Sequence, residues 1–274
     1  MSLAIRGWLA GLSPWARYAL IAALLGVLSY RVVAWAWPWQ PGRLGGLVFG
    51  TFAAVLFINA SLYPWRRRWE TKPLGTAQRW LKLHVYGSVL AFWFVLIHAG
   101  FRWPAGTMGW LLLLLSFWAT ATGLLGIWLQ RMVPPLMARR LTVEAIYERI
   151  PELVAALVVE ADALMAGAPE TLSRAYAGEI RPMLATTRPT MQWLTGSAPL
   201  VVKSGESLNR IRPFVGSADR PRLDDLEAIL QDKLDLDAQM SLQRVLRGWL
   251  ILHVPPAILL IGLMATHIVA VVLH

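Results

Sequence analysis

The chain has 274 residues, of which 57% are hydrophobic, and it contains no cysteine. A soluble domain averages about 45–50% apolar residues, so this composition indicates a membrane protein. Without cysteine, the chain forms no disulfides and binds neither zinc nor iron–sulfur clusters through thiolates. Any metal or cofactor must be held by histidine, methionine, carboxylate or backbone groups.

The charges are unevenly distributed. The window 133–246 holds 15 of the 16 acidic residues and 13 of the 26 basic ones, a net charge of −2, and the only other acidic residue is Glu70. The rest of the chain has a net charge of +12. Because these basic residues flank apolar segments, we interpret them as orienting the chain in a membrane and pairing with acidic groups there, not as a nucleic-acid-binding surface.

Five apolar segments reach the length of about 20 residues that a helix needs to cross the hydrocarbon core. We expect them at about residues 16–37, 44–64, 79–101, 108–130 and 248–273. The N-terminal stretch superficially resembles a signal peptide but lacks a convincing small-residue cleavage site. We therefore expect a retained first helix, with a short interfacial helix before it at residues 3–12.

The loops between these segments predict their orientation. The loop between the third and fourth segments carries only Arg102. The loop between the second and third carries six basic residues: Arg66, Arg67, Arg68, Lys72, Arg79 and Lys82. Because cytoplasmic loops are enriched in Lys and Arg, we expect the N-terminus in the cytoplasm and the C-terminus outside.

Tryptophan is frequent, with 15 residues, and many of them fall at the expected membrane interfaces. An aromatic belt accounts for most of them without any further function. These interfacial residues are Trp35, Trp37, Trp39, Trp65, Trp69, Trp80, Trp103 and Trp249.

The predicted fold class is an all-α membrane protein with five transmembrane helices and a helical cytoplasmic insert. We expect four membrane helices within residues 1–132, the insert at 133–246, and the fifth membrane helix at 247–274. The insert is either a small helical subdomain or docking arm, or a linker made of two extended helices.

Helical periodicity marks two parts of the insert. The first is 141–165, interrupted once by Pro151, and the second is 223–246. The region between them, 167–222, is rich in Pro, Gly, Ser and Arg, which is typical of loops and short turns.

Two of the apolar segments carry a histidine at each end. Residues 83–98 read LHVYGSVLAFWFVLIH and residues 252–267 read LHVPPAILLIGLMATH, and the remaining histidine, His274, is the terminal residue. A spacing of 14 residues keeps both histidines of a helix on nearly the same face, about 21 Å apart along its axis. Each segment therefore presents one imidazole in each leaflet.

The expected topology pairs these histidines by depth. Both segments run from the cytoplasm outward, so His84 should meet His253 at the inner side and His98 should meet His267 at the outer side. Haem iron takes two opposed imidazoles as axial ligands, and filling both positions suits electron transfer. The alternative is that the histidines only pack or form hydrogen bonds. Zinc binding or a proton pathway would need carboxylates, and no Asp or Glu falls in any expected span.

Residues near the histidines fit the surroundings of a haem. The matching hexapeptides WLKLHV and WLILHV place Trp80 and Trp249 one turn before a histidine. Small residues let a flat macrocycle approach a helix, or equally let helices pack: Gly87 and Gly262 lie on the two histidine segments, and Gly123 and Gly126 lie on the fourth segment. Basic residues at the rims could pair with haem propionates or simply snorkel: Arg102 at the outer rim, and Arg79, Lys82 and Arg247 at the inner rim.

With its paired H-x13-H helices, the chain resembles membrane-bound dihaem b-type cytochromes. Such helices recur in the cytochrome b of quinol-oxidising complexes, in respiratory membrane anchors and in ferric reductases. The resemblance implies two b haems, one ligated by His84 with His253 and the other by His98 with His267. It covers the third to fifth segments, and the first two only by hydrophobicity.

The chain also departs from these families. It has no PEWY-like quinol motif, no flavin or nicotinamide domain after the last helix, and a long insert that respiratory anchors do not share. The spans offer no carboxylate for the protons that quinol oxidation releases. Pro255 and Pro256 stand where the first stretch has Tyr86 and Gly87, and they should kink the helix or free carbonyls there. We expect a quinone or partner contact near that point.

The leading expectation is an electron-transfer subunit of a respiratory oxidoreductase complex in the bacterial inner membrane. It would link the quinone pool to a periplasmic or peripheral redox partner, such as a c-type cytochrome or an iron–sulfur protein. A second reading is a stand-alone transmembrane reductase of the ferric type. A third is a haem-free transporter or scaffold.

Overall fold

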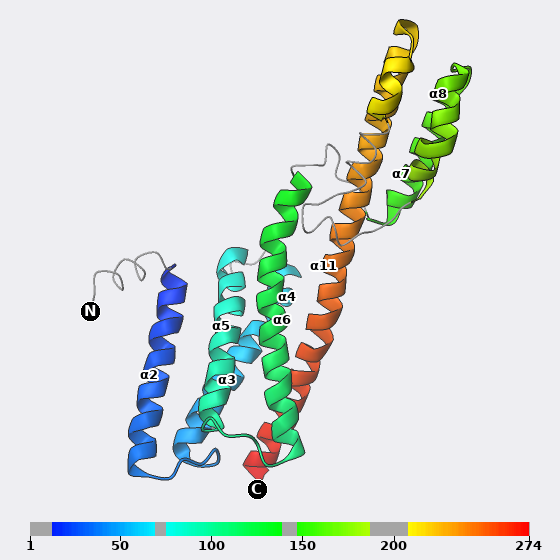
Figure 1. Cartoon of the computed structure of the whole chain (residues 1–274). Helices are drawn as coiled ribbons and strands as arrows, with labels where there is room; N and C mark the ends of the chain where they lie inside the picture. Colours follow the sequence, from blue (N-terminus) through cyan, green and yellow to red (C-terminus); the bar gives the residue numbers. More distant parts are fainter. Residues whose placement is uncertain (1–12, 69–74, 139–146, 187–207, 274) are drawn as a thin grey trace, which may run out of the picture. The chain divides into compact units, whose positions relative to one another are not determined.

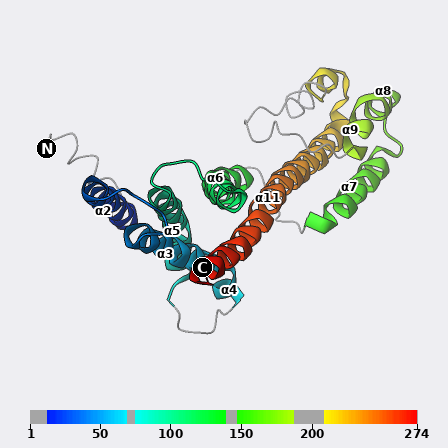
Figure 2. The same cartoon turned by 90° about the horizontal axis from the view of Figure 1, so that it is seen from below.

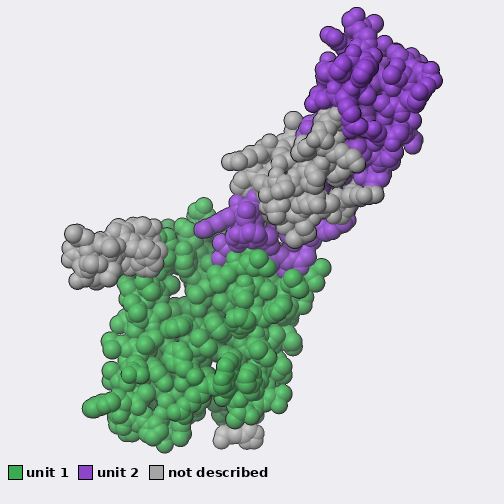
Figure 3. Space-filling model, viewed as in Figure 1, with its two compact units in different colours: residues 1–125, 250–274 green, residues 126–249 purple. Residues whose placement is uncertain are grey.

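The structure is a computed structural model that describes residues 13–68, 75–138, 147–186 and 208–273 (Figure 1). All regular secondary structure in these ranges is helical. The expected interfacial helix at 3–12 lies outside the described residues. The chain divides into two compact units, residues 1–125 with 250–274, and residues 126–249 (Figure 3).

Five helices are long and apolar enough to cross a membrane, and the first four lie where the sequence predicts them to within a few residues. Four are α2 (Pro14–Ala36), α3 (Leu44–Ser61), α5 (Ala77–His98) and α6 (Thr107–Ala138). The fifth membrane segment is the C-terminal part of α11 (Arg220–Leu273). A short helix, α4 (Tyr63–Arg68), follows α3. The chain is thus an all-α protein of membrane type.

Capping residues explain where two of these helices begin. The Ser13 hydroxyl accepts a hydrogen bond from the Ala16 backbone N–H at 3.2 Å, and Pro14 follows at the first helical position, where its missing N–H costs nothing. The Thr76 hydroxyl caps α5 by accepting from the Arg79 N–H at 3.3 Å. At the other end of α5, Gly100 has a φ of +65°, a left-handed conformation that ends helices.

Helices α2 and α3 both pack on α5, and Figure 2 shows the three beside one another. Their shared core contains Ala53, Phe94 and Ile97. The Trp93 indole N–H donates to the Ala23 carbonyl at 3.2 Å and ties α5 to α2. Trp39, expected in the interfacial belt, is instead buried in this core, where its indole donates to the His98 carbonyl at 3.2 Å.

The expected second insert helix and the fifth membrane helix are one helix. α11 is 54 residues long and runs through Pro255 and Pro256 without a break. A helix-interior proline removes the hydrogen bond to the carbonyl four residues earlier, so Pro256 leaves the Leu252 carbonyl without its usual donor. The Trp118 indole N–H of α6 donates to that carbonyl at 2.9 Å. The expectation that the proline pair frees backbone carbonyls is therefore met, with a side chain from α6 as the partner.

The second unit is also helical. It contains the 3-10 helix η1 (Tyr147–Arg149), α7 (Ile150–Met165), α8 (Glu170–Ala175), the π-helix η2 (Tyr176–Ile180), α9 (Arg181–Ala185), and the 3-10 helices η4 (Arg212–Phe214) and η5 (Ser217–Asp219) before α11. Its core includes Ala161, Leu172, Ile180, Leu184, Leu223 and Leu226.

Two expectations for the insert need correction. Pro151 does not interrupt the first helix; it lies in the first turn of α7, where the backbone N–H groups have no intrahelical partner. The stretch expected to form loops holds the nearly continuous run α8–η2–α9, because Leu172, Tyr176, Ile180 and Leu184 recur at helical spacing and are all buried. Residues 187–207 of that stretch lie outside the described ranges.

Candidate functional site

The four membrane histidines meet in two pairs. The ring centroids of His84 and His253 are 6.2 Å apart, with 76° between the ring planes. Those of His98 and His267 are 6.4 Å apart, at 79°. Each pair joins α5 to α11, so these two helices run parallel through the first unit, as the loop charges predict. All four rings are partly buried.

The separation of each pair is that of two imidazoles bound to one metal. With metal–nitrogen bonds of about 2.0–2.1 Å and ring bonds near 1.33 Å, two imidazoles on opposite sides of one metal have centroids roughly 6.4 Å apart. Direct packing of the two rings does not require that distance. The geometry therefore admits a metal between the members of each pair.

Hydrogen bonds to α3 orient the two histidines of α5. The His84 Nδ1–H donates to the Ala60 carbonyl and the His98 Nδ1–H donates to the Gly46 carbonyl, both at 2.8 Å. A carbonyl can only accept, so in a neutral ring the proton must sit on Nδ1, and Nε2 keeps its lone pair. Metal-ligating histidines characteristically donate their other ring N–H in this way.

A proline lies close to the acceptor of the His84 proton. Pro64 stands four residues after Ala60, at the position whose N–H would bond to the Ala60 carbonyl in a continuous helix. α3 ends at Ser61, and the Ala60 carbonyl accepts from the backbone N–H of Leu62, the C-cap residue, as well as from His84. The proline four residues after Ala60 can be recognised in the sequence. The sequence does not show that His84 of α5 binds to the Ala60 carbonyl.

His98 reaches its acceptor because residue 50 is a glycine. A Cβ placed on Gly50 would lie 2.9 Å from Nδ1 and 3.1 Å from Cε1 of His98, closer than real Cβ atoms approach. The Gly46 carbonyl, one turn earlier on α3, accepts the His98 proton. Sequence reasoning singled out neither glycine, since nothing local shows that α3 faces His98.

His253 is oriented by a hydroxyl of α6. The Thr122 Oγ1–H donates to the Trp118 carbonyl at 2.7 Å, so Thr122 accepts from the His253 Nδ1 at 2.9 Å. Again the proton is held on Nδ1 and Nε2 is left as a ligand atom. Within the described residues, no such bond is found for His267. Three of the four imidazoles are thus fixed in the tautomer that metal binding needs.

An apolar layer separates the two histidine pairs. Ala91 lies seven residues from each histidine of α5, and Leu260 lies seven residues from each histidine of α11. Both are buried and belong to one core cluster with Ala54, Phe57, Ala119 and Met264. The two pairs are therefore distinct sites, about 21 Å apart along the helices.

The glycines singled out from the sequence have different surroundings. Gly87 is buried on the histidine face of α5, and a Cβ there would meet only Leu56 and Leu83, both at 3.9 Å. A Cβ atom added to Gly123 would lie 3.5 Å from Cε1 of His253. Gly262 is exposed with nothing near it, about half a helical turn around from His253, so the structure does not bring it to the site.

The tryptophans and basic residues predicted to contact a haem differ in their surroundings. Trp249 packs directly on Gly126, where a Cβ would meet the indole at 2.1 Å, so this glycine serves helix packing. Arg247 donates to the Glu148 carboxylate at 2.6 Å and stacks over the Tyr147 ring at 4.1 Å, within the second unit. Trp80 is half-buried, and three predicted propionate partners are exposed: Arg79, Lys82 and Arg102.

No cluster of three or more His, Asp or Glu side chains that could hold a metal ion occurs in the described residues. A haem iron differs, because the macrocycle supplies four ligands and the protein only two. Comparison with family models, curated proteins and solved structures finds no match to this chain. The geometry of the histidine pairs is therefore the main indication of function in this chain.

Proposed function

We propose that this chain is a membrane dihaem b-type cytochrome, with one haem held by His84 and His253 and the other by His98 and His267. It would carry electrons across the bacterial inner membrane as a subunit of a respiratory oxidoreductase complex, between the quinone pool and a periplasmic or peripheral redox partner. The N-terminus and the insert would be cytoplasmic and the C-terminus periplasmic.

One observation carries the proposal: two imidazole pairs at metal-sharing distance stand at opposite ends of the same two helices. A packing role would explain one such pair but gives no reason for a second with the same partner helices and the same separation. A hydrocarbon core of about 30 Å puts sites about 21 Å apart into different leaflets. That arrangement suits a route for electrons across the bilayer.

The chain's own groups would set the properties of each site. Bound haem b would supply one-electron iron chemistry, and two histidine ligands leave the iron no open position for oxygen or substrate. The backbone carbonyls of Ala60 and Gly46 and the hydroxyl of Thr122 hold the imidazoles in place. Arg102 remains the proposed propionate partner at the outer rim, whereas Arg247 already has Glu148 as a partner.

The proposal is tested by reduced-minus-oxidised absorption spectra of the purified chain. We expect a b-type band, about half of which is lost in His84→Ala and in His98→Ala, and nearly all in the double variant. His274→Ala serves as the histidine control and should keep the full band. Retention of the band in the double variant, in protein that elutes and folds normally, contradicts the ligand assignment.

The competing functions predict different results. A haem-free transporter or scaffold gives no b-type band at all. A stand-alone ferric-type reductase gives the band but no change in haem reduction when quinol is added, whereas a quinone-linked subunit is reduced by quinol. The absence of membrane carboxylates leaves proton release to a partner or to the aqueous loops.

A further inference from the structure

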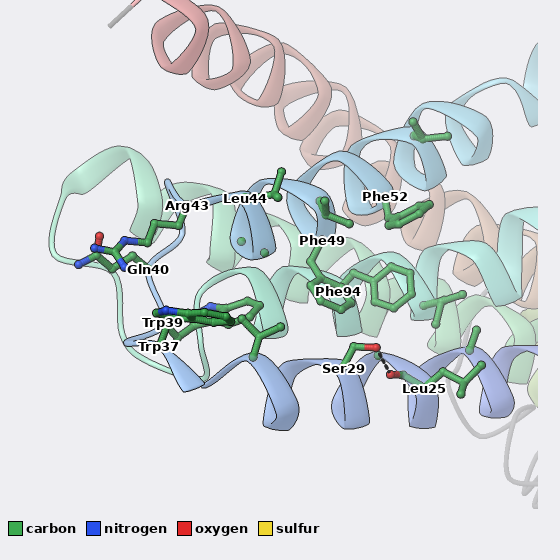
Figure 4. A pocket seen from close by; sticks show the side chains of 18 of the residues that line it. Leu25, Ser29, Trp37, Trp39, Gln40, Arg43, Leu44, Phe49, Phe52 and Phe94 are labelled. Atoms are coloured by element: carbon green, nitrogen blue, oxygen red, sulfur yellow. Dashed lines mark hydrogen bonds between the residues drawn. The ribbon is translucent and has the colours of Figure 1, made fainter. Parts of the chain in front are cut away.

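An open groove lies in the first unit between α2 and α3, with α5 as its floor (Figure 4). Its volume is ≈ 1020 Å³, which is ample for a large ligand. The walls are almost wholly apolar and include Leu25, Gly26 and Val33 of α2, Phe49 and Phe52 of α3, and Phe94 of α5. The groove exists because α2 and α3 both pack on α5 and leave space between them.

The polar groups of the groove gather at one end. Arg43 and Gln40, from the connection between α2 and α3, stand at its mouth, as Figure 4 shows. Ser29 lies deeper, but its hydroxyl already donates to the Leu25 carbonyl at 2.9 Å. No carboxylate occurs among the lining residues. A ligand of this groove therefore needs a long apolar part and an anionic or strongly accepting head.

The mouth favours negative charge for two reasons. Arg43 is exposed and makes no ion pair within the described residues. It directly precedes α3, whose first turn contains no acidic residue, so the positive end of the helix dipole lies at the same place. Trp37, which is 65% exposed, lies at the mouth, and tryptophan is enriched at the level of lipid headgroups.

The length of the groove matches one leaflet. Its lining residues on α2 extend from Ala22 to Val33, about 17 Å of helix at 1.5 Å per residue. Half of a hydrocarbon core of about 30 Å is roughly 15 Å, the depth that the acyl chain of one leaflet occupies. A chain that enters at the Arg43 end would therefore end near the middle of the bilayer.

We propose that this groove binds an anionic phospholipid, with its phosphate at Arg43 and the N-terminus of α3 and one acyl chain between α2 and α3. Basic pockets between membrane helices recognise anionic headgroups by the same chemistry. The site touches the outer histidine pair through Gly46, which lines the groove and accepts the His98 proton. A bound lipid would thus brace the backbone that orients His98.

The test is native mass spectrometry of delipidated protein to which dioleoyl phosphatidylglycerol or dioleoyl phosphatidylcholine is added. We expect the wild type to retain one phosphatidylglycerol per chain in preference to phosphatidylcholine. Arg43→Gln should lower its retention about tenfold, and Ser29→Phe, which fills the groove, should do the same. Arg31→Gln removes an exposed cation of α2 that does not line the groove and should leave retention unchanged.

Equal retention of the two lipids by the wild type overturns the proposal, even if the variants fold poorly. So does full retention by Arg43→Gln, or recovery of a neutral prenyl quinone in place of the phospholipid. Because lipid retention is measured by mass, its outcome is independent of the haem spectra, and either proposal can fail alone.

Discussion

The indole N–H of Trp118 donates to the carbonyl of Leu252, the acceptor that Pro256 leaves without a backbone donor. One turn later on α6, Thr122 holds the His253 imidazole, which directly follows Leu252. The proline pair that distinguishes the second histidine stretch from the first therefore creates a docking point for α6. It fixes this helix beside the inner histidine pair.

Removing the Trp118 bond should destabilise the first unit by about 1 kcal/mol, since a lone carbonyl in the bundle loses its partner. The variant is Trp118→Phe, measured by thermal unfolding in detergent. In a Pro256→Ala background the Leu252 carbonyl regains a helical donor, so the same substitution should cost much less. Equal costs in both backgrounds would show that the freed carbonyl is not what Trp118 stabilises.

Thr122→Val should weaken haem binding at the inner pair. It keeps the shape of the side chain but removes the acceptor for the His253 Nδ1–H, and loss of such a partner typically costs 10–100-fold in metal affinity. Haem titration followed by the b-type band measures the change. Thr120→Val, also buried on α6 but bonded only to the Ser116 carbonyl, is the matched control and should bind both haems normally.

Gly50→Ala should affect the outer pair alone. The new methyl group would overlap His98, whose Nδ1 lies 2.9 Å from the Cβ position, so the ring must leave the Gly46 carbonyl. We expect loss of about half of the b-type band, with the inner haem retained. Gly262→Ala adds a methyl group to an exposed helix position with no neighbour within 4 Å and should bind both haems. Haem loss in that control would restore Gly262 as a cofactor contact.

The second unit should weaken in acid through Asp162. Arg181 donates to both of its carboxylate oxygens, at 2.8 and 2.9 Å, and Tyr176 adds a third bond at 2.6 Å. The Arg181 hydrogen bond, and after it the Tyr176 one, lower the pKa of Asp162 below its usual value. A lowered folded-state pKa contributes stability above the unfolded pKa of about 3.9, and this contribution disappears as the pH falls through the folded value.

Hydrogen exchange of peptides from residues 150–185 measures this effect on the full chain. Protection in the wild type should fall toward that of Asp162→Asn as the pH drops from about 4 through the lowered folded-state pKa of Asp162, because the carboxylate is neutral in both states only below that folded value. At neutral pH the variant should exchange faster than the wild type. Glu160→Gln, at an exposed position of α7, should match the wild type throughout. A constant difference between wild type and Asp162→Asn across pH would rule out the linkage.

The positions of the membrane helices and the register of the histidines can be predicted from the sequence. Apolar length and the helical repeat are local properties, so the five membrane helices and the shared face of His84 and His98 follow from them directly. Local patterns also have limits. They predict an interruption at Pro151, although the first turn of a helix accepts proline, and they contain no signal that α11 continues through two prolines.

The groups that surround the histidines, in contrast, depend on how the helices pack. The carbonyls of Ala60 and Gly46, the hydroxyl of Thr122 and the small size of Gly50 matter through the rotation of α3 and α6 about their own axes. That rotation depends on packing between segments far apart in the chain. Gly262 illustrates the same dependence, because it shares a helix with His253 yet faces outward. The sequence supplies the imidazoles, and helix packing fixes which of their nitrogens can bind a metal.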